Sequence, residues 1–353
     1  MAQPDLVLRG VTGGGPEHEI RPAGEDGGMT PERAPDPVAV FQAERPRLTG
    51  IAYALCGQVM DAEDVVQDAW LRWQGVADRA AIVNPAAWLT TVVSRLALDR
   101  LRSARNQRET YVGPWLPEPL VTATALVGGG GGPGPDPGDV VAEAERLSLA
   151  FLAAVERLNP VERAVLLLRE VFDLDYADIA EVVGRTADNC RQIARRARDR
   201  VGGTGRPHRP GPEREGELAA AFFTALAGGD LDHLRSLLAA DVHLHSDGGG
   251  KARAALHPVL GADRVARFLI GVTRKRQPGD RVALVRINGD PALYLQRRGR
   301  PLGVIVIQVD DGVVSDIRAV LNPDKIGHLA GLDAPIPVGP GPAAPFDRPG
   351  DGH

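Results

Sequence analysis

A run of five glycines, Gly128–Gly132, is the feature that most constrains the fold of this chain. Prolines at alternate positions follow it, and a segment so rich in glycine and proline behaves as a linker. The chain is therefore expected to fold in separate blocks, and 353 residues suffice for two or three domains. The expected divisions are a disordered leader at 1–36, a helical block at 37–110, a linker at 111–139, a second helical block at 140–203, a linker at 204–212, an α+β block at 213–333 and a flexible tail at 334–353.

Local signals predict three helices in the first helical block. Apolar residues recur at three- and four-residue steps from Val38 to Leu55. Asp61 is placed to cap a second helix, and Asn84 followed by Pro85 is typical of the start of a third.

The second helical block carries the pattern of a helix-turn-helix. Asn159 is expected to cap one helix, with Pro160 in the first turn and Glu162 as the reciprocal capping partner. The next helix is expected to stop at Gly184, and Thr186 to cap the helix that follows. In a helix-turn-helix that last helix lies in the major groove of DNA. The simpler alternative is a solvated basic face on a helical bundle.

The last helix of this block carries side chains suited to DNA. Arginine, asparagine and glutamine read the edges of guanine and adenine, whereas arginines farther along contact phosphates. Cys190 on the same helix could serve as a redox switch, but a small packed residue is the favoured interpretation. The candidate DNA-binding residues are Arg185, Thr186, Asn189, Arg191, Gln192, Arg195 and Arg196.

Charge is unevenly distributed in the first block. Its second helix carries Asp61, Glu63, Asp64 and Asp68, whereas its third carries five arginines against the single acid Asp99. The two faces could meet two different partners, or they could be the outer faces of two amphipathic helices. Charge alone favours the second interpretation.

Composition excludes several classes of protein. The formal net charge of −5 excludes a protein that coats nucleic acid with its whole surface, although local basic patches remain compatible with it. No apolar run is long enough for a membrane span, and the N-terminus lacks a secretory pattern. Cys56 and Cys190 show no metal-ligand spacing and fit a reduced cytoplasmic compartment. The expected disorder of the leader makes translation from Met29 instead of Met1 plausible.

The order of the motifs resembles a known family. The stretches "DAEDVVQDAW" and "NPAAWL", then a linker and the helix-turn-helix, are similar to regions 2 and 4 of sigma-70 factors of the extracytoplasmic-function group. The resemblance implies that the four acidic residues of the second helix meet core RNA polymerase, and that the loop 77–84 and the helix from Arg95 to Arg105 meet the −10 promoter element. Region 4 would bind the −35 element. The residues implied at the −10 element are Arg95, Asp99, Arg102 and Arg105.

The third block narrows the resemblance. Two helices, a strand, a helix over 261–276 and three strands with hairpin turns at "INGD" and "VDDGV" predict an α+β domain. This order of elements resembles the cone-shaped fold of SnoaL-like proteins. The stretches "WLPEP", "DGGGKARAALHP" and "NPDK" resemble the subgroup with a fused C-terminal SnoaL-like domain. The implied regulatory interdomain residues are Trp115, Pro117, Asp247, Gly248, Gly249, Gly250, Lys251, Asn322, Pro323, Asp324 and Lys325.

The "DGGGK" and "WLPEP" segments each allow a structural and a functional interpretation. The "DGGGK" segment could be a tight turn, or a contact loop in which backbone N–H groups form an anion nest with Lys251. The "WLPEP" segment could be a stiff docking arm that presents Trp115, or a proline-rich spacer.

His243, His245 and Asp247 alternate along the strand expected near Val242, so they share one face. A metal site or an acid–base pair is conceivable there, but the expectation is no catalytic residue, no metal and no cofactor.

The expected function is that of a sigma factor that directs core RNA polymerase to promoters, with intramolecular control by the C-terminal domain. Its expected partners are core RNA polymerase, promoter DNA and its own C-terminal domain, with no membrane; a small ligand of the SnoaL-like domain is left open. Two alternatives are a stand-alone helix-turn-helix regulator and a small-molecule enzyme of cyclase or isomerase type fused to DNA-binding domains.

Overall fold

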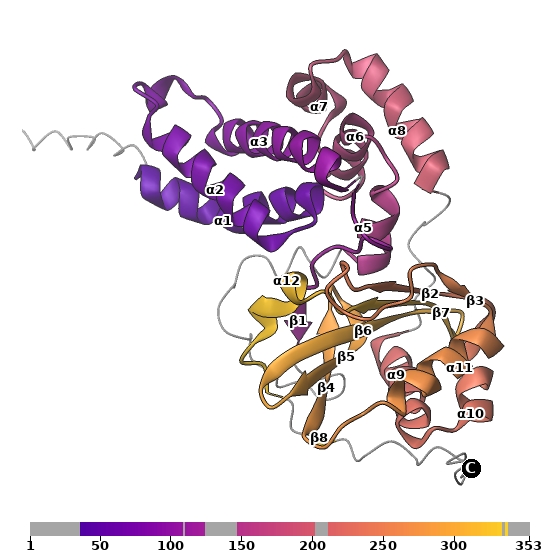
Figure 1. Cartoon of the computed structure of the whole chain (residues 1–353). Helices are drawn as coiled ribbons and strands as arrows, with labels where there is room; N and C mark the ends of the chain where they lie inside the picture. The colour runs from indigo at the N-terminus through magenta and orange to yellow at the C-terminus, as the bar shows by residue number, and fades with distance from the viewer. Residues whose placement is uncertain (1–35, 109, 124–146, 202–210, 334–335, 338–353) are drawn as a thin grey trace, which may run out of the picture. The chain divides into compact units, whose positions relative to one another are not determined.

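The structure is a computed structural model that describes residues 36–108, 110–123, 147–201, 211–333 and 336–337 (Figure 1). The predicted disorder of the leader, the alternative start at Met29, the glycine run, most of the 204–212 linker and most of the tail lie outside the described residues.

The first helical domain consists of α1 (Pro37–Cys56), α2 (Val59–Gln74), the 3₁₀ turn η1 (Arg79–Ala81) and α3 (Pro85–Arg108). The three helices pack through a continuous apolar core. Asn84 caps α3 as predicted, since its Oδ1 accepts a hydrogen bond from the Ala87 N–H. The predicted start of α2 at Asp61 is wrong, because the helix begins at Val59 after Gln58. The Val59 N–H donates to the Glu118 carboxylate at 2.7 Å, so the capping group comes from a distant segment.

The second helical domain contains α5 (Leu149–Val155), α6 (Pro160–Glu170), α7 (Tyr176–Val183) and α8 (Ala187–Val201). The capping box of Asn159 and Glu162 is present. Gly184 ends α7 in the left-handed region with φ of 67°, and the Thr186 hydroxyl accepts from the Asn189 N–H at 3.2 Å. The predicted helix-turn-helix is therefore confirmed, and its core is continuous with that of the first domain.

The third domain is a curved sheet with helices on one face (Figure 1). Its elements are α9 (Pro212–Gly228), α10 (Leu231–Ser236), β2 (Leu238–Asp247), β3 (Val259–Leu260), α11 (Ala262–Thr273), β4 (Asp280–Ile287), β5 (Asp290–Arg297), β6 (Arg300–Asp310), β7 (Val313–Val320), α12 (Pro323–Ile326) and the 3₁₀ turn η2 (Gly327–Leu329).

Two short strands from outside the predicted α+β block complete this sheet. The strand order is β1-β4-β5-β6-β7-β2-β3, with β1 (Val121–Ala123) and β8 (Ile336–Pro337) both paired to β4. All pairs are antiparallel except β2 with β7, which is parallel.

The predicted count of three strands after the helix is wrong, because four are present. The predicted turns at Asn288 and Asp311 are confirmed, both with positive φ. The missed turn lies at Arg298 and Gly299, where φ is 50° and 79°. Two arginines flank that turn, so it lacks the Asn-Gly or Asp-Gly signal of the other two.

The two faces of the sheet have different coverings. One face packs against α9, α10 and α11 through a core that includes Phe222, Leu244 and Leu269. On the other face, Leu116 from the segment before β1 and Leu149 from α5 are buried against the sheet. The expected fold class, two all-α domains followed by an α+β domain, is confirmed.

Candidate nucleic-acid and polymerase interfaces and the motif junction

Helix α8 separates a packing face from an exposed basic face. Cys190, Ile193 and Ala197 are buried against the other helices of the domain. Burial raises the pKa of the Cys190 thiol, which suits a packed residue rather than a reactive thiolate. Every residue predicted to face DNA is exposed, namely Arg185, Thr186, Asn189, Arg191, Gln192, Arg195 and Arg196.

These exposed arginines differ in their partners. Arg191 pairs with Asp188 and lies over the Tyr176 ring, 5.4 Å from its centroid. Arg195 and Arg196 have no ion pair or hydrogen bond in the part of the chain that the structure describes. They are therefore available to phosphates without breaking an internal contact.

Helix α3 makes contact with the helix-turn-helix domain. Arg95 donates to the Glu181 backbone carbonyl at 2.8 Å and pairs with its carboxylate at 3.3 Å. Asp99 pairs with Arg102 at 3.0 Å on the same helix. The side chain of Arg105 lies outside the described residues. One of the residues expected at the −10 element is thus engaged by the helix-turn-helix domain in this arrangement.

The acidic residues of α2 fall into two pairs. Asp61 and Asp64 both accept from Arg100 of α3, at 2.8 and 2.6 Å. The hydrogen bond to Asp61 raises the pKa of the Arg100 guanidinium. Glu63 and Asp68 are exposed and have no ion pair among the described residues. The sequence did not indicate that half of this acidic set is neutralised within the domain.

The loop before α3 exposes an apolar side chain. Val83 is 99% exposed. Trp88, one turn into α3, is half-buried, with its ring 5.5 Å from that of Trp73. Trp88 therefore packs against the core of the first helical domain.

The three sequence stretches singled out above meet in one place. Asp247 is fully buried, and its carboxylate accepts from the Tyr111 hydroxyl at 2.5 Å and from the Leu116 N–H at 2.8 Å. Lys325 donates to the same carboxylate at 2.7 Å and to the Leu116 carbonyl at 2.5 Å. Its ammonium lies 4.0 Å from the Trp115 ring centroid. We call this cluster of Tyr111, Trp115, Leu116, Asp247 and Lys325 the motif junction.

The glycines of "DGGGK" permit this close packing. Gly249 has φ of 55°, and a Cβ there would overlap Asn322 and would lie 2.8 Å from the Tyr111 hydroxyl. Asn322 in turn donates to that hydroxyl at 2.8 Å. Lys251 pairs with Asp324 at 2.5 Å, so its ammonium does not complete the anion nest that the sequence suggested. The structure places this segment as a contact loop, and the "WLPEP" segment as a docking arm.

Three residues beside the motif junction were missed by the sequence reasoning. The Tyr53 hydroxyl of α1 donates to the Glu118 carbonyl at 2.7 Å and accepts from the Asn288 amide at 3.0 Å. Asn288 Oδ1 also accepts from the Leu120 N–H at 3.0 Å. Burial raises the pKa of the Tyr53 hydroxyl, which therefore stays protonated. Asn288 was recognised only as a turn residue, and no local signal marks Tyr53 or Glu118.

The C-terminal domain contacts the first helical domain through Asn288 and Tyr53 and the second through Leu149 of α5, and further contacts join the linker and the two helical domains. His328 hydrogen-bonds to Glu118 at 2.9 Å and to the Pro119 carbonyl at 2.8 Å. The buried Arg163 of α6 donates to the Ala54 carbonyl of α1 at 3.0 Å. A Cβ at Gly57 would come within 2.8 Å of the Trp115 ring, so the docking arm lies directly against the end of α1.

The alternating residues of β2 separate into two environments. Asp247 belongs to the motif junction and does not join the histidines. His243 and His245 instead lie beside Asp316 of β7. Burial, with a smaller effect of Arg318, lowers the pKa of His245 to about 4, so this imidazole is neutral at pH 7.

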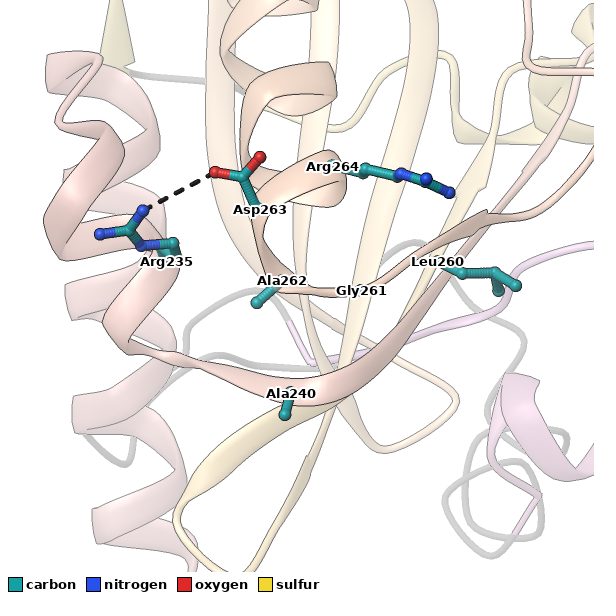
Figure 2. Close-up of a pocket in the computed structure, with 7 residues that line it drawn as sticks. All are labelled: Arg235, Ala240, Leu260, Gly261, Ala262, Asp263 and Arg264. Atoms are coloured by element: carbon teal, nitrogen blue, oxygen red, sulfur yellow. Dashed lines mark ion pairs between the residues drawn. The ribbon is translucent and has the colours of Figure 1, made fainter.

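A surface pocket of about 480 Å³ lies at the edge of the C-terminal domain (Figure 2). It is lined by Arg235, Ala240, Leu260, Gly261, Ala262, Asp263 and Arg264. Arg235 and Asp263 form an ion pair in its lining at 3.7 Å, so part of its charge is internally compensated.

Among the described helices, none is long and apolar enough to cross a membrane.

Comparison with known proteins places this geometry in a family. The chain matches the family models for Sigma-70 region 2 over residues 40–107 and for Sigma-70, region 4 over residues 148–201. It is 41% identical over 303 residues to the ECF RNA polymerase sigma factor SigJ of Mycobacterium tuberculosis, which covers 82% of this chain and 92% of that protein. A probable ECF RNA polymerase sigma factor, SigI, of the same organism is 32% identical over 295 residues, covering 83% and 96%.

A solved structure agrees with these matches. The crystal structure of M. tuberculosis SigJ superposes with a TM-score of 0.66 and 37% identity, covering 84% of this chain and all of that one. The similarity therefore extends through the C-terminal sheet domain, as the three short stretches predicted. From its helix-turn-helix, its region 2 core and this full-length similarity, the chain belongs to the extracytoplasmic-function (ECF) sigma factors of RNA polymerase.

Proposed function

We propose that this sigma factor binds core RNA polymerase through α2, binds promoter DNA through α3 and α8, and is restrained by its own C-terminal domain. Membership of the family carries the first two parts. Two kinds of contact support the third part. The C-terminal domain contacts Tyr53 through Asn288 and buries Leu149 of α5, and Arg95 of the −10 helix contacts Glu181 of region 4. The polymerase supplies the chemistry, and the chain acts as a regulator.

The proposed restraint rests on the contacts of the C-terminal domain with the two helical domains. It contacts region 2 through Asn288 and Tyr53, and it buries Leu149 of α5 against its sheet. A tethered domain acts at high effective concentration, so individually weak contacts suffice to hold the closed arrangement. In this proposal Arg95 leaves Glu181 when it binds the −10 element, and the contacts of the C-terminal domain loosen so that regions 2 and 4 can move apart.

In vitro transcription tests the whole proposal. Full-length protein and a chain that ends at Pro207 are compared for binding to core polymerase and for run-off transcription. Greater transcription by the shorter chain supports restraint, whereas equal transcription contradicts it. Because removal of the domain uncovers Leu116 and Leu149, the point variant Asn288→Gly gives a second test.

The exposed acids of α2 give a test of polymerase binding. Asp68→Lys should weaken binding to core polymerase at least about 10-fold, because it reverses a charge with no partner among the described residues. Fluorescence titration of labelled protein with core polymerase measures the affinity. Glu217→Lys on α9 makes the same charge change on the C-terminal domain and should leave the affinity unchanged. Equal weakening by both variants would mean that only net charge matters.

The free arginines of α8 give a test of DNA binding. Arg196→Ala should weaken binding to all −35 sequences alike and reduce the slope of log affinity against log salt by about 0.9, as expected for one lost phosphate contact. Holoenzyme binding to promoter fragments at several salt concentrations measures this slope. Arg253→Ala removes one exposed charge from the C-terminal domain and serves as the control. A slope identical to that of the wild-type protein would remove Arg196 from the interface.

A further inference from the structure

Two histidines and one carboxylate converge on the sheet of the C-terminal domain, away from the motif junction. His243 and His245 lie two residues apart on β2, and Asp316 lies on the neighbouring strand β7. The parallel register pairs His243 with Asp316 and His245 with Arg318. Side chains at these positions point to one face of the sheet. One ligand atom from each of the three lies within 4.8 Å of the others.

We propose that His243, His245 and Asp316 form a binding site for a divalent transition-metal ion, with zinc as the simplest occupant. Ligand atoms on one zinc ion, each at about 2.1 Å, are at most about 4.2 Å apart, so small side-chain rotations would bring the three into range. Two imidazoles and one carboxylate select zinc, nickel, cobalt or copper over magnesium and calcium, which prefer oxygen ligands.

The state of the ligands supports the site. Neither imidazole has a hydrogen bond or ion pair in the part of the chain that the structure describes, although the two rings contact each other with centroids 6.3 Å apart. His245 is half-buried and His243 is exposed, so a metal ion could enter from the His243 side. Neighbouring backbone hydrogen bonds between β2 and β7 fix the strands that carry all three residues.

The surrounding charges limit the affinity in a way that can be tested. Arg318 pairs with Asp316 and would compete with the metal for that carboxylate. Asp310 offsets part of this positive charge, and its Oδ1 is buried without a hydrogen-bond partner among the described residues. Removal of the Arg318 charge should therefore strengthen metal binding, whereas removal of a ligand should weaken it.

The test uses metal-free full-length protein and two probes. Calorimetric titration with zinc should show one ion bound per chain, and cobalt should give a visible absorption band from the histidine-ligated ion. His243→Ala and Asp316→Asn should each weaken binding by more than about 10-fold and abolish the cobalt band. Arg318→Gln should bind more tightly than the wild-type protein.

The controls separate this site from others on the chain. His257→Ala removes an exposed histidine of the same domain and should leave binding unchanged. Since His243 is exposed, its substitution should not alter the unfolding midpoint, which is measured for every variant. Absence of one-to-one binding, or equal affinity of His243→Ala and wild-type protein, would overturn the proposal.

Discussion

Replacement of Asp247 by alanine should destabilise the C-terminal domain by roughly 3–5 kcal/mol. Asp247 is fully buried and Lys325 is 5% exposed, so the substitution leaves a buried ammonium without its counter-charge. It also removes the acceptor of the Leu116 N–H and of the Tyr111 hydroxyl. Burial, followed by Asp247 itself, raises the pKa of Tyr111, so this hydroxyl is a donor at neutral pH and would lose its acceptor.

Urea unfolding followed by tryptophan fluorescence measures this effect, because Trp115 lies against the Lys325 ammonium. The matched control is Lys251→Ala, which breaks the pair with Asp324 nearby. Both partners of that pair are more than half exposed, with side-chain exposures of 57% and 59%, so its loss should cost at most about 1 kcal/mol. A comparable loss in both variants would contradict the view that burial makes the Asp247 pair important.

A double variant separates the pair from its surroundings. Asp247→Ala combined with Lys325→Met removes both charges and keeps an unbranched apolar side chain at position 325. It should recover much of the lost stability, since a buried pair replaced by apolar groups is often close to neutral. Failure to recover would place the main role of Asp247 in its hydrogen bonds to Leu116 and Tyr111.

Local chemistry explains what the sequence could predict. The capping box at Asn159, the left-handed Gly184 and the turns at Asn288 and Asp311 depend on residues only a few positions apart. Such signals can be recognised without knowledge of the rest of the fold. The helix-turn-helix and the exposed face of α8 followed from them.

Long-range pairing explains what the sequence could not predict. Helix α2 begins at Val59 because Glu118, far along the chain, supplies the capping carboxylate. The carboxylate beside His243 is Asp316, because β2 pairs on one side with its sequence neighbour β3 and on the other, in parallel, with β7, which lies far along the chain. Nothing in the sequence around position 316 indicates that partner.

The candidate site shows the same division. The three short stretches were recognised by resemblance. Their physical connection is the buried carboxylate of Asp247 in "DGGGK", which accepts hydrogen bonds from Leu116 of "WLPEP" and Lys325 of "NPDK". The acidic set on α2 was identified by charge, yet Arg100 neutralises two of its members from a different helix. Composition and spacing therefore located surfaces, and packing determined which of their residues remain available.

Substitution of Asn288 by glycine should release region 2 from the C-terminal domain and increase transcription. Glycine keeps the positive φ of 52° at this turn, so the hairpin is preserved while the side chain is lost. The variant removes the donor to the Tyr53 hydroxyl and the acceptor of the buried Leu120 N–H. An unsatisfied buried N–H alone costs about 1–3 kcal/mol, and the loss falls on the closed arrangement, where the Leu120 N–H is buried.

A change of about 1–3 kcal/mol shifts the ratio of open to closed molecules by about 5- to 150-fold. Run-off transcription at a limiting concentration of the sigma factor should therefore rise. The affinity for core polymerase, which is bound through α2, should change less. Asp311→Gly also places glycine at a positive-φ hairpin turn, where the residue is exposed and φ is 49°, and should leave transcription unchanged. Lower transcription by Asn288→Gly, with an unchanged unfolding midpoint, would mean that the C-terminal domain supports promoter binding and does not restrain it. The sign of this one difference therefore decides how the fused domain controls the two DNA-binding domains.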